Sequence, residues 1–86
     1  MSYALTSCPM KKQDDLILLG NIIRSLRKSK GYSQEDFAFF IEVNRGYFGA
    51  IERGEVNVSF LNLIKIFRGL QVSPAIFFNK FQLETL

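Results

Sequence analysis

The sequence predicts an all-α fold of five short helices, and three kinds of signal lead to this prediction. Apolar residues recur at intervals of three and four, which is the spacing of one helix face. Residues whose side chains cap helix N-termini stand just before the apolar segments. These caps are Ser33, Asn44, Ser59 and Ser73. Glycines stand near several of the expected helix ends, where a left-handed backbone closes the last turn.

The first helix is expected to begin at Gln13 or Asp14 and to end at Gly31. Its apolar positions share one face and are Leu16, Leu19, Ile22, Ile23 and Leu26. Residues 1–12 are expected to form a loose N-terminal arm, residues 13–81 a single domain and residues 82–86 a C-terminal tail. The arm has three alternatives: it wraps the core, it enters a DNA minor groove through Lys11 and Lys12, or it stays disordered.

The second and third helices are both short and are separated by a tight turn. Ser33 caps the second helix, and Glu35 and Asp36 place negative charge in its first turn, where the helix dipole favours it. Asn44 caps the third helix, which Gly54 ends. Helices of this length are not stable alone, so the pair is expected to act as a unit. Such a unit presents its second helix to a partner, and the usual partner is DNA.

Two further helices complete the predicted fold. Ser59 caps the fourth, and Gly69 lies near its end. The residues expected to face the core from this helix are Leu61, Ile64, Phe67 and Leu70. Pro74 stands at the first position of the fifth helix, where a missing backbone N–H costs nothing.

Composition excludes several classes of protein. The chain has 86 residues, 48% of them hydrophobic, which is enough for one domain with a modest core. A single cysteine, Cys8, excludes an internal disulfide and a cysteine-built metal site, and the sequence has no histidine. No nucleophile–base constellation and no glycine-rich phosphate loop is present, so an enzyme is not expected. We also expect no cofactor, no metal, no small-molecule ligand and no membrane segment.

Four separated motifs resemble the helix-turn-helix of the phage repressor and Cro family. They are RKSKGYSQEDFA from Arg27, IERG from Ile51, SFLNL from Ser59 and GLQVSP from Gly69. Within that family the chain is most similar to the controller proteins of restriction-modification systems, in the segment from Arg45 to Ser59. The resemblance implies a five-helix, repressor-like DNA-binding domain.

The resemblance assigns two structural roles next to the expected DNA surface. Arg27 and Glu52 would form a partly buried ion pair that ties the first helix to the third; the alternative is two independent surface charges. Gln34 would lie against the DNA backbone, where backbone N–H groups at a helix start face a phosphate. The alternative for Gln34 is an ordinary residue at a helix start.

The first residues of the third helix would enter the major groove. Arg45 can donate two parallel hydrogen bonds to guanine O6 and N7. Tyr47 can contact a thymine methyl, a sugar or a phosphate, or it can cover the core. Gly46 and Gly49 stand where the family often has polar side chains, so base contacts would rest on few residues. DNA shape would then carry more of the specificity.

Residues after the third helix depart from the family pattern. Arg53 and Asn57 can both reach phosphates, although Asn57 can also stabilise the loop as a turn residue. Val56 replaces a basic or polar contact residue, and Glu55 adds a negative charge beside the groove. Glu42 stands in the turn before the third helix, where a glycine with positive φ is usual and a glutamate is strained.

Aromatic residues indicate assembly. Phe39 and Phe40 stand where the family has polar residues; core burial explains one of them, and the other covers the arm or a second subunit or is exposed. Apolar residues near and within the fifth helix exceed what one small core absorbs. These residues predict a dimer interface made by Val72, Ile76, Phe77 and Phe81, the alternative being that the phenylalanines close the core of one chain.

Together these observations predict a cytoplasmic bacterial or phage protein that regulates transcription. As the resemblance implies, a homodimer would bind a palindromic operator in double-stranded DNA and control its own restriction-modification operon. It would activate at low occupancy and repress when a second dimer joins on an adjacent site. The alternative is an antitoxin of a toxin–antitoxin pair, or a prophage repressor, with a protein partner.

Overall fold

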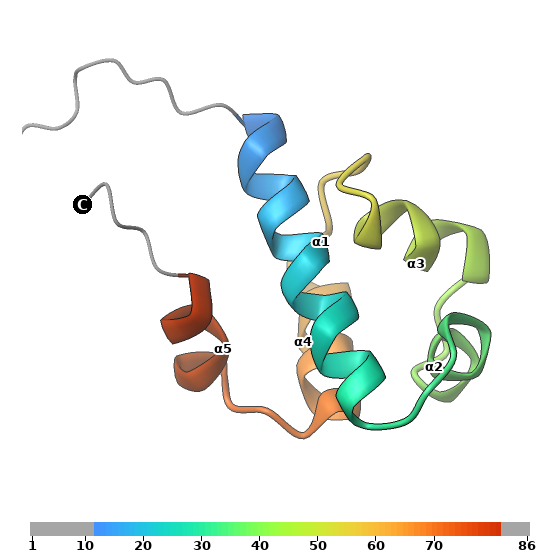
Figure 1. Cartoon of the computed structure of the whole chain (residues 1–86). Helices are drawn as coiled ribbons and strands as arrows, with labels where there is room; N and C mark the ends of the chain where they lie inside the picture. The colour runs from blue at the N-terminus through green and yellow to red at the C-terminus, as the bar shows by residue number, and fades with distance from the viewer. Residues whose placement is uncertain (1–11, 82–86) are drawn as a thin grey trace, which may run out of the picture.

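The computed structural model describes residues 12–81, which form five α-helices and no strand (Figure 1). Their bounds are α1 Lys12–Ser29, α2 Gln34–Phe40, α3 Arg45–Glu52, α4 Phe60–Leu70 and α5 Pro74–Phe81. The all-α prediction is therefore confirmed. The expected tail, residues 82–86, and the arm up to residue 11, with Cys8, lie outside the described residues.

Local side-chain caps begin four of the helices, as the sequence predicts. In each case an oxygen of the cap accepts a hydrogen bond from the backbone N–H three residues further on, at 2.9–3.2 Å. The four caps are Ser33, Asn44, Ser59 and Ser73. Gly31 and Gly54 have positive φ values of 86° and 74° and stand two positions after the last residues of α1 and α3. These local signals fix where each helix begins and ends.

Helix α1 lies in the middle of the domain, with α2 and α3 on one side and α5 on the other (Figure 1). The core between the helices is fully apolar at its centre, where Ile23, Phe37, Phe48 and Phe77 have no exposed surface. Each fully buried side chain of this size stabilises the fold by roughly 1.5–3 kcal/mol through the hydrophobic effect. This packing holds two short helices that would not be stable alone.

Helices α1 and α3 approach each other closely at Gly20 of α1. A Cβ atom added there would lie 2.6 Å from the carbonyl oxygen of Ile51 and closer still to that of Glu52. Backbone atoms of a packed helix cannot move aside cheaply, so only glycine fits at this crossing. The end of α3 is therefore seated directly on α1.

The sequence predicted part of the buried face of α4, since Phe67 and Leu70 are in the core as expected. Leu61, expected to face inward, is 74% exposed, and Ile64 is only partly buried. Ile66, which was not expected in the core, is fully buried. Apolar residues occupy most positions of α4, so two helical registers fit the pattern, and both contain Phe67 and Leu70. Tertiary packing selects between them.

The two adjacent phenylalanines of α2 both lie outside the core. Phe39 is 85% exposed and Phe40 is 56% exposed, so the expectation that the core buries one of them is wrong. The inner face of α2 is filled by Phe37 and Ala38 instead. The Phe40 ring stacks on Tyr32, with ring centroids 5.5 Å apart.

The turn between α2 and α3 contains a residue in the left-handed backbone conformation, and this residue is not a glycine. Glu42 has φ 61° there. The carbonyl oxygen of Glu42 accepts a hydrogen bond from Nζ of Lys65 at 3.3 Å, and the next backbone N–H, of Val43, donates to Ala38 O at 2.9 Å. A left-handed conformation costs a non-glycine residue of order 1–3 kcal/mol. The surrounding packing therefore imposes this turn on the glutamate.

Candidate nucleic-acid interface

A buried ion pair fixes the position of α3. Nε of Arg27 donates to Oε2 of Glu52 at 2.7 Å, and Nη2 of Arg27 donates to Oε1 at 3.0 Å. The two residues are only 6% and 1% exposed. Two parallel charge-assisted bonds fix direction as well as distance. The pair therefore joins α1 to the end of α3, rather than consisting of two independent surface charges.

Gln34 extends this ion pair to α2. Its Nε2 donates to Oε1 of Glu52 at 2.9 Å, so part of its donor capacity is used inside the protein. Arg24 approaches the same carboxylate at 3.6 Å, and Nη1 of Arg27 donates to the carbonyl oxygen of Tyr32 at 2.8 Å. Glu52 thus joins three helices. The sequence did not indicate the Gln34–Glu52 bond, because the residues are 18 positions apart and no local pattern pairs them.

The outer face of α3 begins with an exposed arginine. Arg45 and Gly46 are both exposed, so the start of this helix is accessible to a large ligand. Tyr47 is half-buried and packs against the core, which limits its reach. An arginine at the start of a helix can enter a DNA major groove and bind guanine through its planar fork. Arg45 has the accessibility that this contact requires.

Gly49 lies in the middle of α3, where two polar side chains converge. A Cβ atom added at Gly49 would lie 3.1 Å from Nη1 of Arg53 and 3.2 Å from Oε1 of Gln34. The missing side chain therefore leaves room for a guanidinium and a carboxamide against the helix. Arg45, Gly49 and Arg53 are spaced four residues apart, so they form one stripe along the helix.

Arg53 is paired with an acidic residue. Its Nε donates to Oε2 of Glu55 at 2.9 Å, and both side chains are about half exposed, at 52% and 55%. This hydrogen bond lowers the pKa of the Glu55 carboxyl, which is therefore ionised at neutral pH. The sequence predicted a negative charge at Glu55 beside the groove but did not predict its pairing with Arg53, because residues two positions apart share no helix face.

The remaining site residues lie in two places. Asn57 is exposed in the loop after α3, while Val56 beside it is partly buried against the core. Val72, Ile76 and Phe77 belong to the α4–α5 region, apart from the outer face of α3. Within residues 12–81 no group of three or more acidic or cysteine side chains could hold a metal ion, and no helix is long and apolar enough to cross a membrane.

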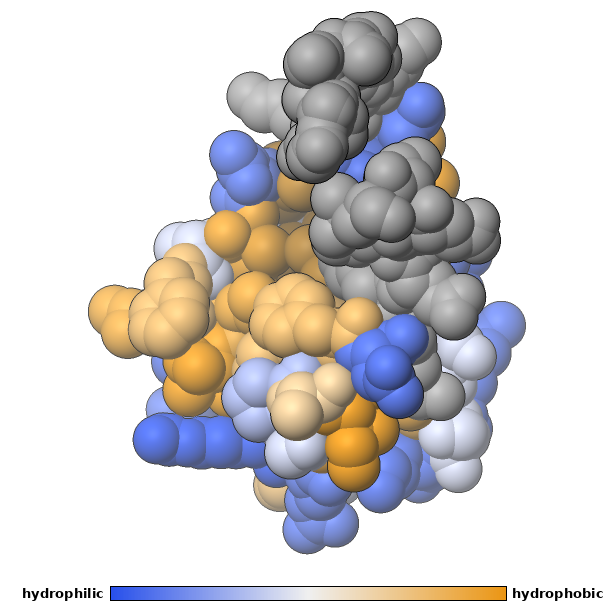
Figure 2. All heavy atoms as spheres, turned by 90° about the vertical axis from the view of Figure 1, so that its left-hand side faces the viewer, coloured by the Kyte–Doolittle hydropathy of each residue, from blue (hydrophilic) through white to orange (hydrophobic). Residues whose placement is uncertain are grey.

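The α5 surface is apolar, but not in the way the sequence predicted. Phe77 has no exposed surface and its ring lies 4.7 Å from that of Phe67 in the core, so it cannot itself meet a second subunit. Ile76 is 57% exposed and Phe78 is 48% exposed. Hydrophobic side chains gather on the face over α5 in Figure 2. The side chain of Phe81 lies outside the described residues.

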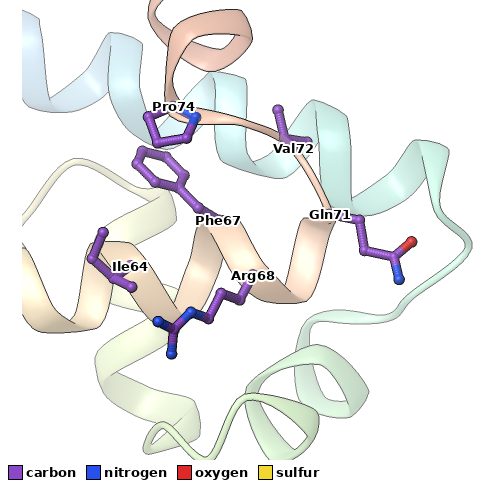
Figure 3. A pocket seen from close by; sticks show the side chains of 6 residues that line it. All are labelled: Ile64, Phe67, Arg68, Gln71, Val72 and Pro74. Carbon is purple, nitrogen blue, oxygen red and sulfur yellow. The ribbon is translucent and has the colours of Figure 1, made fainter.

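A shallow groove of about 320 Å³ adjoins this surface. It lies between α4 and the segment leading to α5, and Figure 3 shows the Phe67 ring beside Pro74, with Arg68 extending outward. Ile64 and Val72 complete its apolar lining. Exposed apolar residues around a groove of this kind are typical of a protein–protein contact.

Five helices of this arrangement, with an α3 whose start is exposed and whose end is held by a buried ion pair, define a helix-turn-helix protein. The helix-turn-helix family model matches residues 23–77. The control protein C.MunI of a Mycoplasma species is 42% identical over 72 residues, which are 83% of this chain and 97% of that protein. The control protein C.BamHI of Bacillus amyloliquefaciens is 44% identical over 59 residues, or 67% of this chain and 73% of that protein.

Solved structures give the same result. The restriction-modification controller protein C.AhdI of Aeromonas hydrophila matches with a TM-score of 0.71 and 41% identity, covering 74% of this chain and 97% of that one. A C.Esp1396I controller tetramer, solved with its natural 35-base-pair operator, matches with a TM-score of 0.74 and 34% identity, covering 83% and 93%. The chain belongs to the helix-turn-helix family, among its restriction-modification controller proteins. This is a class of DNA-binding regulators and not of enzymes.

Proposed function

We propose that this protein is the transcriptional controller of a restriction-modification operon and that it binds an operator upstream of its own gene. The observation that carries the proposal is the exposed Arg45 on a helix whose other end is fixed by the buried Arg27–Glu52 pair. A fixed helix with an exposed arginine at its start suits base readout in a major groove. Such a protein acts where bacterial DNA is, in the cytoplasm.

The proposed contacts divide into two kinds. Arg45 reads a base edge, and the exposed backbone of Gly46 allows the helix start to approach the groove closely. Asn57 and the start of α2 contact phosphates, which position the protein but carry no sequence information. One N–H of the Gln34 carboxamide remains free to donate to a phosphate, because the other donates to Glu52.

The proposed assembly is a dimer that contacts through the α4–α5 surface. The exposed side chains there include Ile76 and Phe78 of α5, with Leu61 at the start of α4, and Val72 adds part of its surface at the groove. A two-fold axis would place two copies of α3 about 34 Å apart, one turn of DNA. The C.Esp1396I structure contains a tetramer on one operator, which supports a second dimer joining on an adjacent site. One dimer would then activate and two would repress.

A binding titration tests this function. The protein is titrated against DNA from immediately upstream of its own gene and against random DNA of equal length, each at two salt concentrations. We expect the upstream fragment to bind about a thousandfold more tightly. Weak binding that is the same for both DNAs would contradict the proposal and favour a protein partner, such as the toxin of a toxin–antitoxin pair.

Replacing Arg45 by alanine should weaken operator binding by about 1–3 kcal/mol. The loss should be concentrated at one base pair, because the arginine fork recognises guanine through two specific acceptors. The measurement is the Kd for the operator and for a set of operators that each carry one base-pair change. An equal loss on every sequence, random DNA included, would show that Arg45 contacts phosphate only.

A further inference from the structure

The hydrogen bond between Arg53 and Glu55 restrains the arginine side chain, and a simple phosphate contact would not need this restraint. The bond runs from Nε of Arg53 to Oε2 of Glu55, at 2.9 Å. Both terminal nitrogens of the guanidinium therefore remain available. These two nitrogens form the fork that binds guanine O6 and N7 in parallel.

The guanidinium of Arg53 also lies where a side chain could contact a base edge. Arg53 follows the last residue of α3, but its Nη1 lies over Gly49, one turn back along the helix. Side chains of a helix lean toward its N-terminus, which is the end that enters the groove. Gly49 has no side chain to block this placement, and Oε1 of Gln34 lies over the same residue.

The outer face of α3 and the loop after it offer few side chains that could contact bases. Val56 is partly buried against the core and offers no polar group to DNA. Gly46 likewise offers no side chain on the outer face of α3, and Gly49 is buried against the side chains of Gln34 and Arg53. Arg53 and Arg45 are the two arginines of the stripe formed by Arg45, Gly49 and Arg53. Arg53 stands eight positions after Arg45, but its Nη1 lies over Gly49, which is about one helical turn from Arg45.

We infer that Arg53 is a second specificity-determining residue and that Glu55 is its positioning residue, holding the guanidinium so that its fork meets a base edge. The inference rests on the proposed function and replaces a phosphate role for Arg53. A half-exposed arginine has many rotamers, and fixing it beforehand lowers the entropy cost of binding. The ionised carboxylate that provides this restraint also repels the phosphates of any DNA. The restraint favours only DNA in which Arg53 meets a base edge, so the net effect of Glu55 on binding affinity differs between sequences.

The test uses the full chain and four variants: Arg53→Ala, Glu55→Gln, the double variant and Glu35→Gln. Each is titrated against the operator, against operators with single base-pair changes and against random DNA. Glu35→Gln is the matched control, because Glu35 is an exposed carboxylate in the first turn of α2 and has the same charge change. Thermal unfolding monitored by circular dichroism checks that each variant is folded.

We expect Arg53→Ala to weaken operator binding about 5- to 150-fold, with the loss at one base pair that Arg45 does not read. Glu55→Gln should weaken operator binding about two- to fivefold and relax discrimination at that same base pair. Its binding to random DNA should not weaken, since a repelling charge is removed. When Glu55→Gln is added to Arg53→Ala, the double variant should discriminate between base pairs no less than Arg53→Ala alone. Glu35→Gln should tighten binding to all DNAs alike.

Two results would overturn the inference while leaving the proposed function intact. One is an Arg53→Ala variant that binds every sequence more weakly by the same factor, with the salt dependence reduced by about one ion, which is the behaviour of a phosphate contact. The other is a Glu55→Gln variant that behaves like Glu35→Gln or keeps the discrimination of the wild type. Failure of the proposed function would appear differently, as a wild-type protein without preference for the operator.

Discussion

Replacing Arg27 by alanine should lower the free energy of unfolding by about 3–5 kcal/mol. The cause is the buried charge left behind, because Glu52 is 1% exposed and would keep as partners Gln34 and the partly exposed Arg24, whose Nε lies 3.6 Å away. A domain of this size has about 5–15 kcal/mol in total, so the loss is a large fraction of its stability. Urea denaturation followed by circular dichroism measures it.

The chain offers a matched control for this experiment. Arg24 approaches the same carboxylate at 3.6 Å, but its side chain is 41% exposed. Arg24→Ala should therefore change stability by less than about 1 kcal/mol. A double variant, Arg27→Met with Glu52→Gln, removes both charges and should be more stable than Arg27→Ala alone. Equal effects of Arg27→Ala and Arg24→Ala would contradict the role given to the buried pair.

Replacing Phe77 by alanine should cost about 3–5 kcal/mol of folding stability, through a cavity in the core of a single chain. The phenyl ring is completely buried and contacts the rings of Phe67 and Phe78 at centroid distances of 4.7 and 5.4 Å. The neighbouring Ile76 is 57% exposed, so Ile76→Ala should leave folding nearly unchanged and weaken dimerisation. Unfolding and sedimentation experiments separate the two effects.

Dimerisation stabilises a folded chain by mass action, so the Phe77 experiment needs a monomeric background. The Phe77→Ala change is therefore repeated in the Ile76→Ala variant, at several protein concentrations. A core role predicts the same loss in both backgrounds. A loss that disappears in the Ile76→Ala background would instead place Phe77 in the subunit interface, as the sequence alone suggested.

Local signals in the sequence predicted the helix ends well. Caps such as Ser33 and Asn44 act on the backbone three residues away, so a short segment contains all the information needed. Glu42 was likewise identified as a residue in a turn that prefers positive φ, and it has φ 61°. The Arg27–Glu52 pair came from a family resemblance and not from the chain's own periodicity, because 25 positions separate the two residues.

Features that depend on how helices pack were not predictable. The buried face of α4 was predicted at Phe67 and Leu70 but not at Leu61, because apolar residues at most positions support two faces, and only the neighbouring helices distinguish Ile66 from Leu61. Gly20 gave no signal, since its importance is the nearness of the backbone of α3. The Gln34–Glu52 and Arg53–Glu55 contacts are side-chain geometries that follow no helical spacing.

The seating of α3 on α1 has a consequence for kinetics. The backbone of α1 at Gly20 touches the last residues of α3, and the buried ion pair adds a second connection nearby. Detaching α3 would break both together, so the hydrogen-bonded amide protons at the C-terminal end of α3 should exchange with deuterium only when the whole domain unfolds. DNA would then meet a helix that is already ordered. Association would need no folding step, and charge and salt would govern how fast the operator is found.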